Sequence, residues 1–465
     1  MRKTKIVCTL GPASMRRETI AALIRAGMDV ARLNTSHGDP EQHSGAINLV
    51  REVSAEEGRP IGILMDLGGP KLRTGRNKGH EPIELKPGLE VSLVPDDVPG
   101  TAETISIGYP RLLEDVRAND TVLLNDGAIE LKVDRVEADA LHCRVIYGGP
   151  LGEQKGVSFP MTTLTTPAIT DHDREYIKLG VKEEVDYFGL SFVREAADIV
   201  AARDIIAGLG AETPVIAKIE RRQAVANLES ILEEADGAMV ARGDLGVELP
   251  PEDVPVQQHR IITASGREMI PVITATQMLE SMMQSTRPTR AESSDVAHAV
   301  WDLSDALMLS GETAIGQYPV EAVAMMDRII RRAEEAFPTE QEMLPRSGED
   351  DHSYVVALAT RQIIESDANM RGVVCFTRSG YTALLLSKVH QPAPIFAITP
   401  SEAVCRRLTL ARSVIPILAP VVSSTEEVLD TVDRVLVEGH YLSVGDEVVV
   451  VASMPVDAAS TTNFL

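Results

Sequence analysis

Eight short and nearly continuous apolar runs alternate with helix-forming stretches, and this alternation constrains the fold of the chain more than any other feature. The runs span Lys5–Thr9, Asp29–Asn34, Ile61–Asp66, Asp186–Ser191, Val215–Ile219, Gly237–Ala241, Val272–Thr276 and Ala306–Leu309. Parallel strands that are buried on both faces have this composition. Helical stretches with capping signals, such as Ser14–Ala26 and Asp39–Glu57, lie between the runs. We expect an α/β fold in which eight strand–helix units close into a (β/α)8 TIM barrel, with the active site at the C-terminal strand ends.

A long insert, from about Gly69 to Pro167, interrupts this rhythm between the third and fourth runs. It is rich in glycine and proline, and it contains short alternating runs such as Thr121–Leu124 and Leu141–Ile146. This pattern predicts a small all-β domain inside one βα loop. A domain in that position can act as a lid over the active site.

The alternation restarts after an acidic helical connector, Val320–Glu342. Further strands are expected at Val373–Phe376, Ile395–Ile398, Val414–Ile417 and Val448–Ala452, with helices around Thr382–His390, Ser401–Ala411 and Thr425–Glu438. This indicates a smaller α/β domain with an open sheet. We therefore expect a barrel domain of residues 1–69 and 168–342, an inserted β domain of residues 70–167, and a C-terminal α/β domain of residues 343–465.

The chain is strongly acidic, with 45 Lys and Arg residues against 69 Asp and Glu residues and a formal net charge of −24. Such a surface repels nucleic acid and anionic lipid. Aromatic residues, at 3% of the chain, are also too few for stacking on single-stranded nucleic acid. No apolar stretch has the length of a membrane span. We expect no nucleic-acid partner and no membrane partner. An anionic metabolite can bind only where several cationic side chains converge.

The cysteines point to a reducing compartment. Cys8, Cys143, Cys375 and Cys405 are widely separated and form no Cys-x-x-Cys pair, which argues against a zinc ribbon or a disulfide framework. The apolar run before Gly11 is too short for a signal peptide. A cytoplasmic protein is therefore expected.

Polar residues follow the apolar runs where the barrel strands are expected to end. Arg32, Asn34 and Ser36 lie two positions apart, so an extended chain would place them on one face. The arginine offers a planar fork for a phosphate or carboxylate, and the Asn and Ser oxygens suit a cation. A polar turn with a surface arginine is the alternative interpretation.

The third run ends in Asp66, and a Gly-Gly-Pro hinge then precedes two alternating cations, Lys71 and Arg73. This arrangement suits a lid that carries positive charge into the cleft. An ordinary loop with solvated basic residues is the alternative.

Lys218 and Glu220 share a face at the end of the fifth run, and Asp244 follows the sixth. Two carboxylates from neighbouring strands can hold Mg²⁺ and leave positions for substrate and water. Lys218 would neutralise a transferring group as a point charge. A Lys–Glu ion pair that caps the barrel and a Schiff-base lysine are the alternatives, and the nearby carboxylate argues against the second.

Thr276 and Ser310 place hydroxyls after the seventh and eighth runs. Such hydroxyls can bind a carboxylate or relay a proton, but they also serve commonly as helix caps. The sequence has no G-x-x-x-x-G-K-[ST] loop and no Ser–His–Asp arrangement. The strand ends together indicate metal-assisted chemistry on a small phosphorylated acid, without identifying the reaction.

Several of these runs closely resemble the pyruvate kinase family, and the resemblance extends over essentially the whole chain and its order of domains. The runs are Thr4–Ser14, Ala31–Gly38, Ala217–Glu220, Met239–Glu248, Thr276–Ser281, Arg287–Glu292 and Leu309–Ala314. The resemblance implies transfer of a phosphoryl group from phosphoenolpyruvate to ADP, which gives pyruvate and ATP in the final step of glycolysis. It also implies a Mg²⁺ cofactor, replaceable by Mn²⁺, a small β-barrel lid and a homotetramer.

The resemblance assigns roles at the substrate site. Arg32 and Lys218 would contact the transferring phosphoryl group, and Lys218 would stabilise its charge. The Mg²⁺ ligands would be Glu220 and Asp244. The substrate carboxylate would be held by the Gly243 and Asp244 backbone and the Thr276 hydroxyl, with Thr276 and Ser310 on the water path that protonates the enolate.

The nucleotide and its second metal would be served by residues of the lid and of the second strand end. These residues are Asn34, His37, Arg73, Asp126 and Lys155.

One departure from the family concerns the monovalent cation. K⁺-dependent members of the family carry Glu where this chain has Lys71, and Lys at that place accompanies K⁺-independent activity. The Lys71 ammonium would supply the charge that K⁺ otherwise brings beside Asn34, Ser36 and Asp66, and Leu67 removes a hydroxyl ligand from that site. We expect no requirement for K⁺, and a role of Lys71 in lid closure.

A second departure concerns regulation. Thr377, Ser379, Gly380 and Thr382 lie between an expected strand and helix, where backbone N–H groups and hydroxyls can cradle a phosphate. They match the effector phosphate loop of the family, although a Ser/Thr-rich turn with a helix cap is the alternative. The loop Met454–Asn463 contains no glycine, unlike members activated by fructose bisphosphate. We expect a sugar-monophosphate or nucleotide-monophosphate effector, or none.

Two other functions share part of these features. An aldolase or mutase barrel acting on phosphoenolpyruvate or a related acid would need no nucleotide lid, so Arg73, Lys155 and the insert argue against it. A catalytically inactive metabolite sensor would have no need for the intact set that includes Lys218, Glu220 and Asp244.

Overall fold

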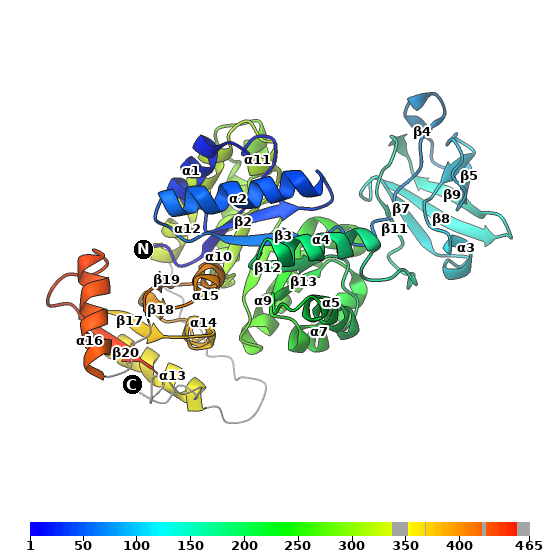
Figure 1. The fold of residues 1–465 in the computed structure, drawn as a ribbon. Helices are drawn as coiled ribbons and strands as arrows, with labels where there is room; N and C mark the ends of the chain where they lie inside the picture. The colour runs from blue at the N-terminus through cyan, green and yellow to red at the C-terminus, as the bar shows by residue number, and fades with distance from the viewer. Residues whose placement is uncertain (337–351, 368, 421–424, 453–465) are drawn as a thin grey trace.

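The computed structural model describes residues 1–336, 352–367, 369–420 and 425–452, and its central element is a closed barrel of eight parallel strands (Figure 1). The strands are β1 (Lys5–Thr9), β2 (Val30–Asn34), β3 (Gly62–Asp66), β12 (Tyr187–Leu190), β13 (Val215–Ile219), β14 (Gly237–Ala241), β15 (Val272–Ala275) and β16 (Ala306–Leu309). Around the barrel their order is β1, β16, β15, β14, β13, β12, β3 and β2. The expected (β/α)8 barrel is confirmed, and each predicted run supplies one strand.

Two layers of apolar side chains explain why the strands are continuous apolar runs. One set, which includes Val7, Leu64 and Met239, packs into the interior of the barrel. The alternate residues, such as Ile6 and Ile63, pack against the surrounding helices. Both faces of each strand are therefore removed from water, so neither face selects polar residues.

Helices cover the outside of the barrel. They are α1 (Arg17–Ala26), α2 (Pro40–Glu56), α4 (Asp171–Lys182), α5 (Ala196–Gly208), α6 (Arg222–Ala226), α7 (Leu228–Glu234), α8 (Arg242–Glu248), α9 (Val254–Arg267), α10 (Arg290–Trp301), α11 (Gly311–Ala314) and α12 (Pro319–Ala336), with a 3-10 turn at Glu280–Met283. Helices α2, α4 and α10 begin with capping boxes. Helix α1 begins at Arg17 and not at Ser14, because Ser14 Oγ accepts a hydrogen bond from the Gly11 N–H (3.0 Å) and closes a turn there.

The insert between β3 and α4 is an all-β unit, as expected. Its main sheet has the order β11 (Val157–Ser158), β7 (Thr121–Leu124), β8 (Ile129–Val136), β9 (Leu141–Tyr147), β5 (Glu90–Val94) and β6 (Thr104–Ser106), while β10 (Gly149–Leu151) pairs with β4 (Ile83–Leu85). A 3-10 turn (Lys78–His80) and the short helix α3 (Leu112–Asp115) lie between strands. The segments that enter and leave the insert are tied together, because the Val157 N–H donates to Leu72 O at 3.0 Å.

The C-terminal unit is an open parallel sheet with helices, also as expected. The sheet order is β19 (Val414–Leu418), β18 (Ile395–Thr399), β17 (Met370–Phe376) and β20 (Glu447–Val451). Its helical segments are α13 (His352–Ser366), α14 (Tyr381–Lys388), α15 (Glu402–Arg407), Leu408–Leu410, α16 (Thr425–Asp433) and Arg434–Glu438. The end of the predicted connector, residues 337–342, and the loop of residues 454–463 lie outside the described residues.

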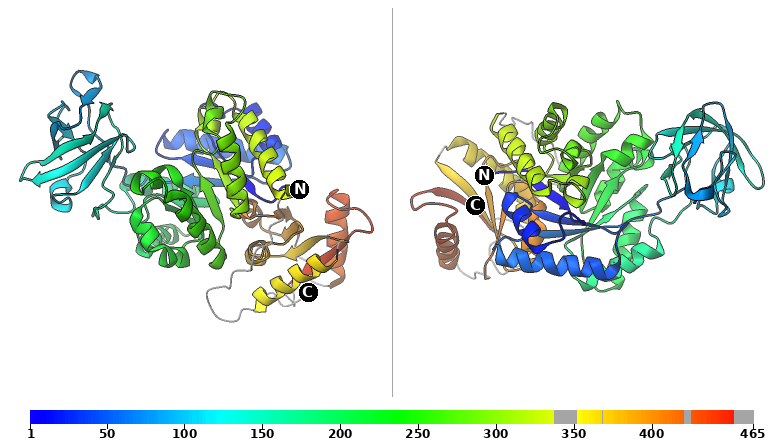
Figure 2. Two further views of the ribbon diagram at one scale, coloured as in Figure 1. Left: turned by 180° about the vertical axis from the view of Figure 1, so that it is seen from behind. Right: turned by 90° about the horizontal axis from the view of Figure 1, so that it is seen from above.

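The insert and the C-terminal unit lie at opposite ends of the molecule (Figures 1 and 2). Contacts of the C-terminal unit reach the N-terminal ends of the barrel strands. Lys388 forms an ion pair with Asp305, which immediately precedes β16, and Arg406 Nε lies 2.9 Å from Asp186 Oδ1, just before β12. The C-terminal strand ends, which carry the predicted site, are therefore left open toward the insert. Within the described residues, no helix combines the length and the apolar character needed to cross a membrane.

Candidate active site

The guanidinium of Arg32 is held by the strands on either side of β2. Nε donates to Asp66 Oδ2 at 2.7 Å, Nη2 also contacts that oxygen, and Nη1 donates to Thr9 Oγ1 at 3.0 Å. Only 9% of Arg32 is exposed. Burial alone would raise the pKa of the Asp66 carboxyl, but the charges of Arg32 and Lys218 lower that pKa below its ordinary value. Arg32 is therefore fixed opposite a carboxylate that remains ionised.

The Lys218 ammonium on β13 lies among three oxygen atoms. Nζ is 2.6 Å from Ser191 Oγ, 2.9 Å from Glu220 Oε1 and 3.1 Å from Asp66 Oδ1. Burial opposes the charged form, yet the carboxylates of Asp66 and Glu220 raise the pKa of Lys218 above its ordinary value. A lysine held protonated in this way is a poor Schiff-base nucleophile and a good fixed positive charge.

Glu220 and Asp244 form the carboxylate pair that the strand ends predict. Both line one pocket, and the Phe192 N–H donates to Glu220 Oε2 at 2.8 Å. Burial and the charge of Asp244 raise the pKa of Glu220 above its ordinary value, although Lys218 acts in the opposite direction. Two neighbouring carboxylates repel each other, and burial of one of them increases the repulsion. Such a pair favours the binding of a cation between or beside the two groups.

The turn after β15 has an unusual backbone. Thr276 and Gln277 have φ values of 68° and 55°, a left-handed conformation that is rare for a β-branched residue. Arg242 supports the turn by donating from Nη2 to Thr276 O at 2.6 Å and from Nε to Ala275 O at 3.2 Å. The Thr276 hydroxyl accepts from the Gly243 N–H at 2.8 Å. Strand β15 and the start of α8 are thereby held together at the barrel mouth.

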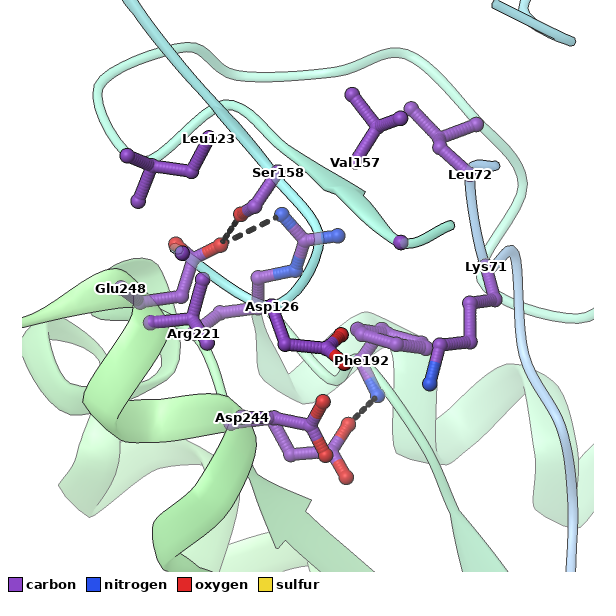
Figure 3. A pocket seen from close by; sticks show the side chains of 14 residues that line it. Lys71, Leu72, Leu123, Asp126, Val157, Ser158, Phe192, Arg221, Asp244 and Glu248 are labelled. Carbon is purple, nitrogen blue, oxygen red and sulfur yellow. Dashed lines mark hydrogen bonds and ion pairs between the residues drawn. The ribbon is translucent and has the colours of Figure 1, made fainter. Parts of the chain in front are cut away.

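A pocket lies between the insert and the barrel mouth (Figure 3). Its lining is Lys71, Leu72, Leu123, Asp126, Gly127, Gly156, Val157 and Ser158 on one side, and Phe192, Glu220, Arg221, Asp244, Val247 and Glu248 on the other. Among the described residues, the Lys71 ammonium has no hydrogen-bond or ion-pair partner. The pocket therefore joins the two barrel carboxylates to a cation and a carboxylate from the insert.

The other predicted nucleotide residues are not in the lining of this pocket. Arg73 Nη1 donates to Gln154 O at 2.9 Å, and the Lys155 N–H donates to Thr74 Oγ1 at 3.0 Å. The side chains of Arg73 and Lys155 are exposed at the base of the insert. His37 is also exposed, after the end of β2.

The prediction that Arg32, Asn34 and Ser36 share one extended face is wrong for Ser36. Strand β2 ends at Asn34, and the Ser36 N–H donates to Asn34 Oδ1 at 3.2 Å. An asparagine side chain that accepts from the residue two positions later forms a turn in place of extended backbone. Arg32 and Asn34 remain on one face, and Ser36 lies in the turn.

Comparison with known proteins decides the family. The family model for the pyruvate kinase barrel domain matches residues 1–323, and the model for the pyruvate kinase alpha/beta domain matches residues 355–465. The chain belongs to the pyruvate kinase family. Pyruvate kinases are phosphotransferases of glycolysis that act on phosphoenolpyruvate and ADP, and this chain is such an enzyme.

Individual pyruvate kinases match over the full length of the chain. The pyruvate kinase of Geobacillus stearothermophilus is 44% identical over 469 residues, which are 100% of this chain and 80% of that protein. The Mycobacterium tuberculosis pyruvate kinase is 42% identical over 466 residues, covering 100% of this chain and 98% of the relative. A crystal structure of a Cryptosporidium parvum pyruvate kinase superposes with a TM-score of 0.92 at 36% identity, covering 98% of this chain and 95% of the other.

Ser310 and Glu312 complete the mouth of the pyruvate kinase barrel at β16. Glu312 Oε2 accepts from the Ser310 N–H at 2.8 Å, and its Oε1 accepts from the Leu279 N–H at 3.0 Å. Ser310 Oγ is buried and has no hydrogen-bond partner among the described residues. This hydroxyl therefore keeps its hydrogen-bonding capacity for another group.

The predicted effector loop lies between β17 and α14. Thr377 Oγ1 accepts from the Gly380 N–H at 2.9 Å, and Ser379 Oγ accepts from the Tyr381 N–H at 3.4 Å. Gly380 has a φ of 91°, which favours glycine, and Thr382 begins the buried face of α14. The hydroxyls of this loop thus occupy backbone N–H groups that a phosphate would use.

Sequence reasoning missed several residues that build the site of this pyruvate kinase. Ser191 ends the fourth run, so the rule applied to the other strand ends would have found it. Arg221, Arg242, Glu248 and Glu312 act through partners distant in the sequence, and no local signal marks those pairings.

Proposed function

We propose that Lys218 and Arg32 hold the transferring phosphoryl group of phosphoenolpyruvate, while Glu220 and Asp244 hold Mg²⁺, with Mn²⁺ as a substitute. The observation that carries this proposal is the Lys218 ammonium, fixed within 3.1 Å of oxygens from Ser191, Asp66 and Glu220 at the barrel mouth. Phosphoryl transfer needs alignment and charge neutralisation more than covalent help. A protonated, immobile lysine provides both without reorganisation.

The donor set fits a hard divalent cation. Glu220 and Asp244 supply carboxylate oxygens, which Mg²⁺ prefers, and both line the same pocket at the barrel mouth. When bound, the ion would neutralise phosphate charge. Lys218 restrains the Glu220 carboxylate through Oε1.

The substrate carboxylate is assigned to the turn after β15 and to the first turn of α8, which lie side by side. The Gly243 and Asp244 backbone lies in the first turn of α8, and Thr276 Oγ1 already bonds to the Gly243 N–H. We assign Thr276 and Ser310 to the path of the proton that converts the enolate to pyruvate. The buried hydroxyl of Ser310, which has no hydrogen-bond partner in the described part of the chain, supports this assignment.

ADP and its metal are assigned to the insert side of the pocket and to the end of β2. The residues are Asn34, His37, Arg73, Asp126 and Lys155. Asp126 lines the pocket opposite Asp244, and Arg73 and Lys155 carry exposed positive charge at the base of the insert. Movement of the insert would bring these charges toward a nucleotide phosphate.

We further propose that the enzyme needs no K⁺, because Lys71 supplies the positive charge otherwise brought to the region of Asn34, Ser36 and Asp66. Two observations support this: the Lys71 ammonium has no partner among the described residues, and it lines the pocket with Glu220 and Asp244. With Na⁺ or tetramethylammonium as the sole monovalent cation, we expect an undiminished rate. A collapse of the rate that K⁺ restores would contradict the proposal, and Lys71→Glu should create K⁺ dependence.

The effector site is assigned to Thr377, Ser379, Gly380 and Thr382, with a sugar monophosphate or nucleotide monophosphate as ligand. The assignment is supported by the position of the loop between β17 and the start of α14. Titration of such monophosphates against the phosphoenolpyruvate saturation curve tests the assignment. Strong activation by fructose 1,6-bisphosphate alone would contradict it.

We also propose a cytoplasmic homotetramer with domain boundaries near residues 69, 167 and 342. The separate apolar cluster of the insert supports an independent domain, and the C-terminal unit has two clusters, of which the larger also includes Met269 of the barrel domain. The last boundary lies outside the described residues. The four free, buried cysteines agree with a reducing compartment. The tetramer is implied by the family resemblance, and the mass of the particle in solution tests it.

One coupled assay tests the proposed function. Pyruvate formation from phosphoenolpyruvate is followed with and without ADP, Mg²⁺ and K⁺. We expect strict dependence on ADP and on Mg²⁺ or Mn²⁺, and no dependence on K⁺. Pyruvate release without ADP would favour another chemistry on the same acid.

A further inference from the structure

A series of direct contacts runs from the insert to the carboxylate of Glu220. Glu248, at the end of α8, receives two donors on the same oxygen: the Ser158 hydroxyl from β11, and Arg221 Nη1 at 3.1 Å. Figure 3 shows both donors converging on Glu248 at the edge of the pocket. The side chains of Arg221 and Glu248 are only 11% and 6% exposed, so this ion pair is shielded from water.

The guanidinium of Arg221 also covers an aromatic ring. Its Cζ lies 4.9 Å from the centre of the Phe192 ring, within the range of a cation–π interaction. Glu248 thus orients a guanidinium that in turn presses on Phe192. A neutral side chain at position 221 would remove this cation–π contact, although the Phe192 side chain itself would be unchanged.

Phe192 needs such support because its backbone is strained. Its φ is 57°, a left-handed value that a bulky residue rarely adopts unless the surroundings fix it. In this conformation its N–H donates to Glu220 Oε2 at 2.8 Å. The other oxygen of Glu220 is held by Lys218 Nζ at 2.9 Å. The strained peptide therefore sets how the Glu220 carboxylate is turned.

We infer that Arg221 is a positioning residue for the reaction: held by Glu248, it clamps Phe192 so that the Phe192 N–H orients Glu220 for the divalent cation. This inference rests on the proposed role of Glu220 as a metal ligand. Arg221 contacts neither substrate nor metal in this scheme, and it acts only through Phe192. A partner that orients a metal ligand commonly changes metal affinity by about 10- to 100-fold when it is removed.

The alternative is a purely structural role, in which the Arg221–Glu248 ion pair only fixes α8 to the barrel. Both roles predict some loss of thermal stability after substitution, so stability does not separate them. Only the positioning role predicts a change in metal binding by an enzyme that remains folded. The test therefore measures binding of the metal itself, without substrates.

The probe is Mn²⁺, titrated into the full-length enzyme without substrates, with free Mn²⁺ counted by electron paramagnetic resonance. For Arg221→Met we expect the dissociation constant to rise about tenfold or more. Arg222→Met is the matched control, because Arg222 is the next residue, is exposed and is outside the pocket lining. We expect its dissociation constant to stay at the wild-type value. Wild-type Mn²⁺ affinity in folded Arg221→Met would overturn the inference.

Two further variants make every outcome decisive. Glu220→Gln should lose Mn²⁺ binding, and if it binds normally, the metal assignment itself is wrong. If Glu220→Gln loses binding while Arg221→Met keeps it, the positioning role alone is wrong.

Should Arg221→Met fail to fold, Glu248→Gln takes its place. The neutral amide oxygen of Gln still accepts from the Ser158 hydroxyl, and only the interaction with Arg221 is weakened. Unchanged Mn²⁺ affinity in folded Glu248→Gln would also contradict the inference.

Discussion

At the residue scale, the charges of the catalytic centre hold each other in place. Arg32 and Lys218 share the Asp66 carboxylate, and Lys218 also bonds to Glu220 and Ser191. The resulting pKa shifts keep Asp66 ionised and Lys218 protonated. In the proposed function, a phosphoryl group would therefore meet cations whose orientation is fixed by the fold, and such preorganisation is usually the largest source of electrostatic catalysis.

Substitution of Thr276 separates the role of its hydroxyl from the role of its shape. Thr276→Val keeps the branched side chain but removes the oxygen that accepts from the Gly243 N–H. We expect kcat for pyruvate formation to fall about 100-fold, the usual size of a lost proton-transfer group. Thr276→Ser should retain most of the activity in the same coupled assay. Equal losses in both variants would show that the hydroxyl carries no catalytic role.

Sequence reasoning succeeds at this scale where spacing alone decides contact. Lys218 and Glu220 are two positions apart at the end of a strand, and their side chains do meet at 2.9 Å. It fails for Ser36, because the Asn34 side chain ends the strand first. It also does not predict the contact between Arg221 and Glu248, because these residues are 27 positions apart in the sequence and only the fold brings them together.

At the element scale, the barrel strands were predictable and the short helices at the mouth were not. A strand buried on both faces has a distinct composition, so all eight runs stand out in the sequence. Helices α8 and α11 have only 7 and 4 residues, too few for helical periodicity to show. Helix α13, with several β-branched residues, was also not predicted. The strands that carry Arg32 and Lys218 thus have a strong local signal, whereas the short helices beside them at the barrel mouth have a weak one.

Substitution of Gly69 by alanine tests how tightly the hinge of the insert packs against Phe192 and Ser191. Its φ is 65°, and a Cβ there would lie 2.8 Å from Phe192 Cδ2 and 3.1 Å from Ser191 Cβ. Gly79 has a similar φ of 76° but nothing within 4 Å, so Gly79→Ala carries the backbone strain alone. We expect Gly69→Ala to destabilise the fold by about 1–3 kcal/mol more than Gly79→Ala, and to lower kcat by displacing Phe192. Thermal unfolding and the coupled assay measure the two effects.

Equal melting temperatures and equal kcat values for the two alanine variants would show that the hinge accommodates a methyl group freely. Phe192 would then be too mobile to orient Glu220.

At the scale of the whole molecule, the barrel separates two units with different contacts. The insert meets the C-terminal strand ends through the pocket, and the C-terminal unit meets the opposite end through buried polar contacts such as Lys5 Nζ to Val414 O (2.6 Å). The sequence predicts the order of these units from interrupted periodicity. It does not predict their contacts, because buried pairs such as Lys388 with Asp305 join distant positions. The bulk charge of −24 likewise conceals the cations gathered at the mouth.

His390 makes the junction of the barrel with the C-terminal unit sensitive to acid. Burial, with the nearby charges of Arg412, Lys388, Arg361 and Lys3, lowers the pKa of His390 to about 3. Below the unfolded pKa of about 6.5 the unfolded chain binds a proton that the folded chain excludes, so stability falls as pH decreases. We expect wild type to lose roughly 1.4 kcal/mol per pH unit between pH 6 and 4 relative to His390→Gln.

Denaturant unfolding of both proteins at several pH values measures this difference. Parallel pH profiles for wild type and His390→Gln would show that His390 titrates normally in the folded state.

The role of Lys218 in neutralising the transferring phosphoryl group is tested most directly by kcat for pyruvate formation in Lys218→Met, measured at saturating phosphoenolpyruvate, ADP and Mg²⁺. Methionine fills similar space without charge, and Arg32 still compensates Asp66. We expect kcat to fall at least about 100- to 1,000-fold, the loss seen when one preorganised charge donor is removed. The circular dichroism spectrum should remain that of the folded enzyme. A folded Lys218→Met variant with kcat within a few-fold of wild type would contradict the proposed mechanism.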